Sequence, residues 1–96
     1  MRPSTLLDQH RVAIRSAVAA HRAGNPRVFG SVLYGEDTDA SDLDLLVDPA
    51  EGMSLFDLGA IRWELRKLLG IEVDVVTPRA LPENFRAKIL ATAVPV

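Results

Sequence analysis

The 96-residue sequence contains no cysteine, which excludes disulfide bonds and thiolate zinc sites. It also lacks an apolar run near the roughly 18 residues that span a bilayer, and it lacks the long apolar core of a signal peptide. We therefore expect a cytoplasmic protein without a membrane partner. An excess of positive charge is absent as well. The net charge is −2, and we expect no direct nucleic-acid binding from such a chain.

The residues that are present describe an ordinary soluble protein, with 48% hydrophobic and 25% charged positions. A chain of this length can bury one core, so we expect a single domain over residues 1–96. Periodicity and turn signals predict the order α-β-β-α-β-α. The expected ranges are a helix from residue 4 or 5 to about 23, strands at 27–29 and 42–47, a helix ending at 69, a strand at 71–76 and a helix at 82–91.

Local signals support several of these boundaries. The segment 24–26 (Gly-Asn-Pro) is a stop signal for the first helix. Ser54 and Asp57 resemble a capping box at the start of the middle helix, and Gly70 stands where a left-handed C-terminal cap is expected. The chain therefore belongs to the α/β (α+β) class, with about three strands buried on at least one face by about three helices.

Three further expectations concern side chains outside these signals. The last helix should turn Phe85, Ile89 and Leu90 inward, because they recur at helical spacing. His10 and His21 are expected to be exposed on the first helix. The acidic loop at 36–39 is expected to be a solvated turn at the mouth of a site formed by nearby aspartates.

Three aspartates stand inside or beside apolar strand segments: Asp42, Asp44 and Asp74. Residues i and i+2 of a strand point to the same face, roughly 6.6 Å apart along the chain, so Asp42 and Asp44 should project together. If the second and third strands are neighbours, Asp74 can lie beside them. Three such carboxylates repel one another unless a divalent cation such as Mg²⁺ relieves the conflict. The alternative is that all three are the solvent-facing positions of a one-sided sheet.

A Gly-Ser turn precedes the paired aspartates. Gly30 and Gly35 permit backbone conformations and close ligand approach that a β-carbon would block. Backbone amides around Ser31, together with its hydroxyl, could then hold phosphate oxygens. An ordinary turn would have the same composition. Combined with Ser-Asp-x-Asp and an apolar strand, however, the turn forms a much more restrictive pattern.

The segment from Phe29 to Leu45, with its Gly-Ser turn and Asp-x-Asp pair, resembles the signature of the DNA-polymerase-β-type nucleotidyltransferase superfamily. In particular, it is similar to the stand-alone minimal nucleotidyltransferases, the MNT or MntA-like antitoxins. The resemblance extends to the third acidic strand, 72–76, and to the order of elements. One position departs from it: Tyr34 stands where many minimal relatives carry a basic residue. Arg27 and Arg79 are candidates to replace that cation.

The resemblance implies a nucleotidyltransferase fold with a mixed sheet. It implies that Asp42, Asp44 and Asp74 bind metal and are catalytic, with two Mg²⁺ ions expected when an NTP is bound, and that Gly30 and Ser31 contact the triphosphate. The implied reaction moves a nucleoside monophosphate, expected to be AMP from ATP, onto a hydroxyl of a partner protein. The implied partner is a HEPN-domain toxin. The alternative is an inactive antitoxin or binding module that acts by complex formation alone.

Overall fold

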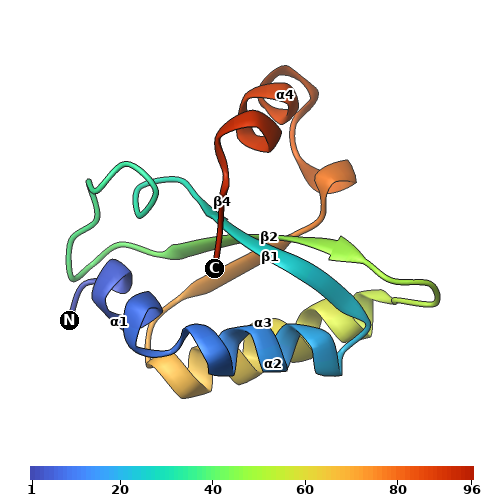
Figure 1. Cartoon of the computed structure of the whole chain (residues 1–96), viewed down its shortest axis with the longest axis horizontal. Coiled ribbons are helices and arrows are strands. Elements are labelled where there is room, and N and C mark those ends of the chain that lie inside the picture. The colour runs from blue at the N-terminus through green and yellow to red at the C-terminus, as the bar shows by residue number, and fades with distance from the viewer.

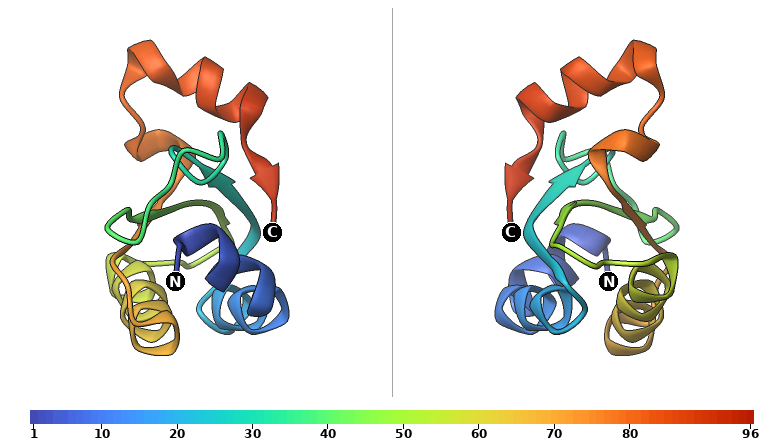
Figure 2. Two further views of the ribbon diagram at one scale, coloured as in Figure 1. Left: turned by 90° about the vertical axis from the view of Figure 1, so that its left-hand side faces the viewer. Right: turned by 90° about the vertical axis from the view of Figure 1, so that its right-hand side faces the viewer.

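The computed structural model describes all 96 residues, and Figure 1 shows their arrangement. A four-stranded sheet lies between three helices on one face and a single helix on the other (Figure 2). The elements are α1 (Pro3–Gln9), α2 (Arg11–Ala20), β1 (Ala23–Phe29), β2 (Leu43–Pro49), α3 (Leu55–Leu69), β3 (Val73–Val76), the 3-10 helix η1 (Pro78–Ala80), α4 (Glu83–Thr92) and β4 (Val94–Pro95).

The sheet has the strand order β3-β2-β1-β4. β1 runs antiparallel to both of its neighbours, whereas β2 and β3 are parallel. Parallel neighbours need a crossover, and α3 supplies it on one face of the sheet. The mixed sheet expected from the resemblance is confirmed. The sequence-based count of about three strands is one short, because the two-residue edge strand β4 also pairs with β1.

The core lies between the sheet and the layer formed by α1, α2 and α3. Leu43, Leu45 and Val47 of β2 alternate toward this layer and are fully buried. They pack in one cluster with residues of the helices and neighbouring strands, among them Ile14, Val18, Val28, Ile61, Leu65 and Val73. The opposite alternation points residues 44, 46 and 48 to the face below α4. None of the helices combines the length and the hydrophobicity that a membrane-spanning helix needs.

α3 begins and ends as the sequence predicts. The Ser54 hydroxyl accepts a hydrogen bond from the Asp57 amide, and the Asp57 carboxylate accepts one from the Ser54 amide. Gly70 adopts φ +70° at the C-terminal cap, a conformation that a residue with a β-carbon adopts only at a cost. These interactions fix the crossover that delivers the chain to β3.

The first helical segment differs from the expectation of one continuous helix. The helix is interrupted at His10, which has φ −125° and joins α1 to α2. α2 ends at Ala20, and β1 already begins at Ala23. The predicted stop at 24–26 therefore lies inside a strand, which accommodates it with a register shift opposite β2 and with φ +48° at Asn25.

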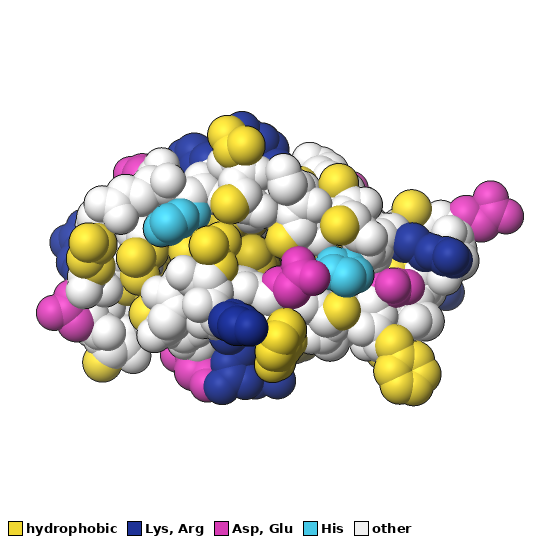
Figure 3. All heavy atoms as spheres, turned by 90° about the horizontal axis from the view of Figure 1, so that it is seen from below, with side chains coloured by type: hydrophobic (Ala, Val, Ile, Leu, Met, Phe, Trp, Pro, Cys, Tyr) yellow, Lys and Arg dark blue, Asp and Glu magenta, His cyan; other side chains and the backbone are white.

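His21 is also less exposed than predicted. It ends α2, and its Nε2 lies 2.8 Å from Glu64 Oε1 of α3, which links the two helices. Figure 3 views this helical face, where the histidines and charged groups surround apolar side chains gathered along its middle.

α4 lies on the other face of the sheet and is poorly packed. Phe85 is 54% exposed and Leu90 is 45% exposed, so the prediction that they point inward is wrong, whereas Ile89 is partly buried. Helical spacing identifies an apolar stripe but does not show whether a surface exists to cover it. Arg86 fixes the start of α4 by donating hydrogen bonds to the carbonyls of Pro78 and Leu81, both at 2.9 Å.

Candidate active site

Asp44 and Asp74 are direct partners in the register of the parallel strands β2 and β3. Their neighbours Leu43 and Val73 are fully buried in the core, so both aspartates project to the opposite face, the one below α4. Asp42, which was predicted to be the first residue of the strand at 42–47, lies just before β2, because the strand begins at Leu43. Asp42 and Asp74 thus lie near enough to Asp44 for their charges to act on it, whereas joint binding of a metal by the three stays a prediction.

Asp44 has the most perturbed environment of the three. It is half-buried, whereas Asp42 and Asp74 are exposed. Burial, the negative charge of Asp74 and that of Asp42 together raise the pKa of Asp44 to about 6. None of the three carboxylates forms an ion pair with a basic side chain. The strand pairing therefore gathers negative charge that no group of the chain neutralises.

This donor set fits a hard divalent cation. As the side chains stand, no three carboxylate or histidine groups of the chain lie close enough together to hold a metal ion. Paired positions on adjacent strands are about 4.8 Å apart, however, so rotation of the side chains can bring oxygens of Asp44 and Asp74 to one ion. Carboxylate oxygens are the ligands that Mg²⁺ prefers, and such ions usually retain water and substrate oxygens. A bound cation would also offset the burial and the repulsion that together raise the pKa of Asp44.

The Gly-Ser turn lies directly against this carboxylate. Gly30 has φ +74°, and a β-carbon built on it would overlap Asp44 Oδ2. Only glycine lets the turn approach this closely. The backbone amides of residues 31–34 donate to no other group of the chain, while Glu36 N closes the turn on Ser31 O at 2.9 Å. Free amides beside a glycine are suited to binding an anion.

Asp37 is a structural residue that the sequence reasoning missed. The loop at 36–39 was expected to be solvated, but Asp37 is 4% exposed. Its Oδ2 accepts a hydrogen bond of 2.9 Å from the Ser4 amide in the first turn of α1. This hydrogen bond, aided by the nearby Arg2, lowers the pKa of Asp37. Asp37 therefore ties the loop between the turn and β2 to the N-terminus of α1, where the helix dipole favours negative charge.

Arg27 is not available as the cation that the site needs. Its two terminal nitrogens lie 3.0 and 3.1 Å from the two carboxylate oxygens of Asp48. This bidentate pair, with a further hydrogen bond from Asn25, lowers the pKa of Asp48. Asp48 points to the same face as Asp44 but stands at the far end of β2, so Arg27 is bound away from the acidic edge.

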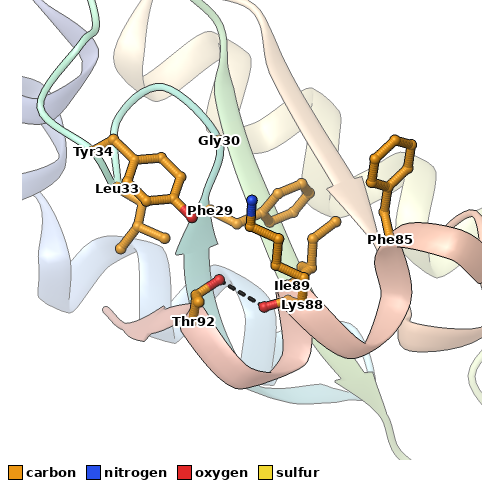
Figure 4. A pocket seen from close by; sticks show the side chains of 8 residues that line it. All are labelled: Phe29, Gly30, Leu33, Tyr34, Phe85, Lys88, Ile89 and Thr92. Atoms are coloured by element: carbon orange, nitrogen blue, oxygen red, sulfur yellow. Dashed lines mark hydrogen bonds between the residues drawn. The ribbon is translucent and has the colours of Figure 1, made fainter.

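A cleft of about 190 Å³ opens beside the turn, between the end of β1 and α4. Figure 4 shows the side chains that line it, which are Phe29, Leu33, Tyr34, Phe85, Lys88, Ile89 and Thr92, together with Gly30. The aspartates themselves do not line this cleft. Phe29 and Gly30 join the two regions, because Phe29 pairs with Asp44 in the antiparallel register and Gly30 touches its carboxylate.

Comparison with known proteins gives a consistent result. A family model described as a nucleotidyltransferase domain matches residues 24–95. The Methanocaldococcus jannaschii protein MJ0435, named as a candidate protein adenylyltransferase, is 40% identical over 76 residues, which are 79% of this chain and 82% of that protein. The protein adenylyltransferase MntA of Thermococcus cleftensis is 33% identical over 90 residues, which are 94% of this chain and 88% of that protein.

Solved structures agree in fold. One described as a candidate minimal nucleotidyltransferase superposes with a TM-score of 0.86 at 42% identity, covering 97% of this chain and 95% of that one. A toxin–antitoxin structure with AMP-PNP superposes with a TM-score of 0.70 over 97% of this chain and 71% of that one. The identity in the second case is 16%, so that likeness concerns the fold alone.

Proposed function

Because this chain belongs to the nucleotidyltransferase family, we propose that it transfers AMP from ATP, with Mg²⁺, to a hydroxyl of a partner protein. The observation that carries the proposal is the register pairing of Asp44 with Asp74, directly beside the Gly30 turn. Two relatives carry the name protein adenylyltransferase, one of them as a candidate, which supports a protein acceptor. The fold neighbour with AMP-PNP supports an adenine nucleotide.

In the proposed reaction the acceptor hydroxyl oxygen attacks the α-phosphorus, and the bond to the bridging oxygen of the β-phosphate breaks to release pyrophosphate. Asp42, Asp44 and Asp74 would hold two Mg²⁺ ions. When bound, these ions would neutralise phosphate charge and orient the reacting oxygens. Asp74 is exposed at the open side of the sheet edge and can accept the proton of the hydroxyl. Gly30 and Ser31 hold the triphosphate chain, so positioning and charge neutralisation provide most of the acceleration.

The proposed partner is a HEPN-domain toxin, which makes this chain the antitoxin of a two-component pair. The structural neighbours named as toxin–antitoxin complexes support a protein partner. A catalytically silent antitoxin that acts by binding alone is the second candidate. It is favoured by the exposed apolar side chains, among them Phe56 at 91%, Trp63 at 61% and Leu55 at 83%, which could contact a partner without chemistry.

The experiment that separates the candidates uses the protein co-purified with the product of its neighbouring gene. The complex is incubated with each of the four α-labelled NTPs, with Mg²⁺ or with EDTA. Transfer of label from ATP to the neighbour, abolished by EDTA, is the expected result. A stable complex that takes up no label from any NTP would refute the enzyme and leave the binding module. Mass spectrometry of the labelled neighbour would identify the acceptor residue.

A further inference from the structure

The cleft beside the glycine turn contains one basic side chain, Lys88. Most basic side chains of this protein contact another group of the chain. Arginines donate to carboxylates or carbonyls. The amino nitrogen of Lys67 lies over the Trp63 ring, 4.8 Å from its centroid, in a cation–π contact. The side chains of Arg79 and Lys88 have no hydrogen bond, ion pair or ring contact. Of these two, Lys88 lines the cleft and Arg79 does not.

The position of Lys88 is set by α4 and faces the turn. In Figure 4 its amino nitrogen extends from α4 toward Phe29 and Gly30, between the two walls of the cleft. At its start, α4 is tied to the segment just before it, because Arg86 donates hydrogen bonds to the carbonyls of Pro78 and Leu81. The Lys88 side chain is exposed and its amino group makes no contact within the chain.

The surroundings of Lys88 favour an anionic ligand. Five of the eight residues that line the cleft are hydrophobic, so the cleft offers the exposed Lys88 ammonium no competing carboxylate. The free amides of residues 31–34 begin at the same turn and also present partial positive charge. Lys88 forms no ion pair with Asp42, Asp44 or Asp74, so it remains available to a ligand.

We propose that Lys88 binds the phosphate chain of the nucleotide and so makes α4 part of the nucleotide site. The inference rests on the proposed function, because the ligand is the NTP of that reaction. The carboxylates and their cations then lie on one side of the glycine turn, and the Lys88 ammonium lies on the other. Phosphate oxygens held by the turn contact Lys88 across the cleft. Lys88 thus provides the cation that neither Tyr34 nor Arg27 supplies.

The test measures binding of two probes, AMP-PNP with Mg²⁺ and adenosine, by isothermal titration calorimetry. Lys88→Ala should weaken AMP-PNP about tenfold, as expected for one charge-assisted contact to phosphate. It should leave adenosine binding unchanged, because adenosine has no phosphate. Lys88→Arg should restore AMP-PNP binding to within about threefold of the wild type. Lys67→Ala, which removes the second lysine from α3, should change neither affinity.

Other outcomes would overturn the assignment. Equal affinity of wild type and Lys88→Ala for AMP-PNP would exclude a phosphate contact. Parallel loss of AMP-PNP and adenosine binding would show that Lys88 only supports the placement of α4. In steady-state transfer assays, Lys88→Ala should raise KM for ATP about tenfold with a smaller change in kcat. If wild type binds AMP-PNP in a Lys88-dependent manner but transfers no label, the proposed function fails while the Lys88 site stands.

Discussion

The two faces of the sheet differ in almost every physical respect, although the same strands build both. Along β2, Leu43, Leu45 and Val47 are fully buried under α2 and α3. The alternate positions Asp44 and Asp48 face α4, where a cleft opens and the helix is half-exposed. One face is an ordinary closed core. The other face buries Leu46 but also holds Asp44 and Asp74, which no basic side chain neutralises, and Asp48, which is paired with Arg27.

The difference shows how a small chain separates stability from function. Burial of aliphatic side chains provides most of the favourable free energy of folding, and here it lies on the helical face. The carboxylates on the other face oppose folding, since Asp44 is half-buried beside two like charges. Substitutions on the helical face should therefore lower stability first, whereas substitutions among the carboxylates should lower activity while relieving repulsion.

The largest expected effect is the loss of transfer activity in Asp44→Asn. Removing the charge of this proposed metal ligand should lower kcat/KM by at least about a hundredfold, which corresponds to about 2.7 kcal/mol of lost transition-state stabilisation. Label transfer to the partner measures this. Asp39→Asn removes the same charge from the exposed loop, and a similar loss of activity in that variant would contradict a specific role for Asp44.

The next largest effect is a loss of folding stability when Leu45, the residue after Asp44, is truncated. Leu45 is fully buried on the helical face, and Leu45→Ala should lower the free energy of unfolding by about 2–5 kcal/mol, from lost burial and an unfilled cavity. Urea unfolding followed by circular dichroism measures the change. Leu55→Ala is the matched control, because Leu55 is 83% exposed and its truncation should cost less than about 0.5 kcal/mol. Equal effects of the two variants would refute the placement of the core.

The elements most predictable from the sequence are those fixed by local interactions. Ser54, Asp57 and Gly70 define α3 through their own side chains and backbone, so short patterns suffice to find them. The proximity of Asp44 and Asp74 could be predicted equally well from the sequence. Strand alternation and a crossover connection place both residues on one face of the sheet, whatever the details of packing. The comparisons support the family that the motif suggested.

The features that the sequence did not reveal depend on distant parts of the chain. Asp37 is buried because Ser4, far away in sequence, donates to it. Phe85 and Leu90 remain exposed although they recur at helical spacing, because only part of α4 packs against the sheet. Lys88 is distinctive only because α4 folds back over the end of β1. No periodic pattern within a segment contains this information.

The third prediction concerns the contact between the turn and the acidic face. Gly30→Ala should lower stability by about 1–3 kcal/mol and also reduce transfer, because a β-carbon at φ +74° is strained and would displace the Asp44 carboxylate. Urea unfolding and label transfer measure the two losses. Gly35→Ala is the control. Gly35 has φ +69°, but a β-carbon there would meet nothing within 4 Å, so only the backbone strain remains. If both variants lose the same activity, the overlap with Asp44 has no functional consequence.

The smallest effect is the pH dependence of stability in the metal-free protein. The pKa of Asp44 is about 6 in the folded state, against an ordinary value of 3.8 for an unfolded chain. Between these values the unfolded chain has lost the proton while the folded chain retains it, so stability falls as pH rises from about 4 to 6 and stays low above. Because Asp44 is partly solvated, screening reduces this contribution to about 1–2 kcal/mol.

The lowered pKa values of Asp37 and Asp48 act in a different range. Their stabilisation is complete above about pH 4 and is lost only at lower pH, so it does not mask the effect of Asp44.

The measurement is urea unfolding of wild type and Asp44→Asn in EDTA from about pH 4 to 7, the range in which Asp44 titrates. The variant should become more stable than wild type as pH rises. Mg²⁺ should stabilise wild type at neutral pH by preferential binding to the folded state, and the variant less. Parallel pH profiles of the two proteins would show that the charge of Asp44 does not oppose folding. The two faces of the sheet would then differ in packing but not in their electrostatic contribution to stability.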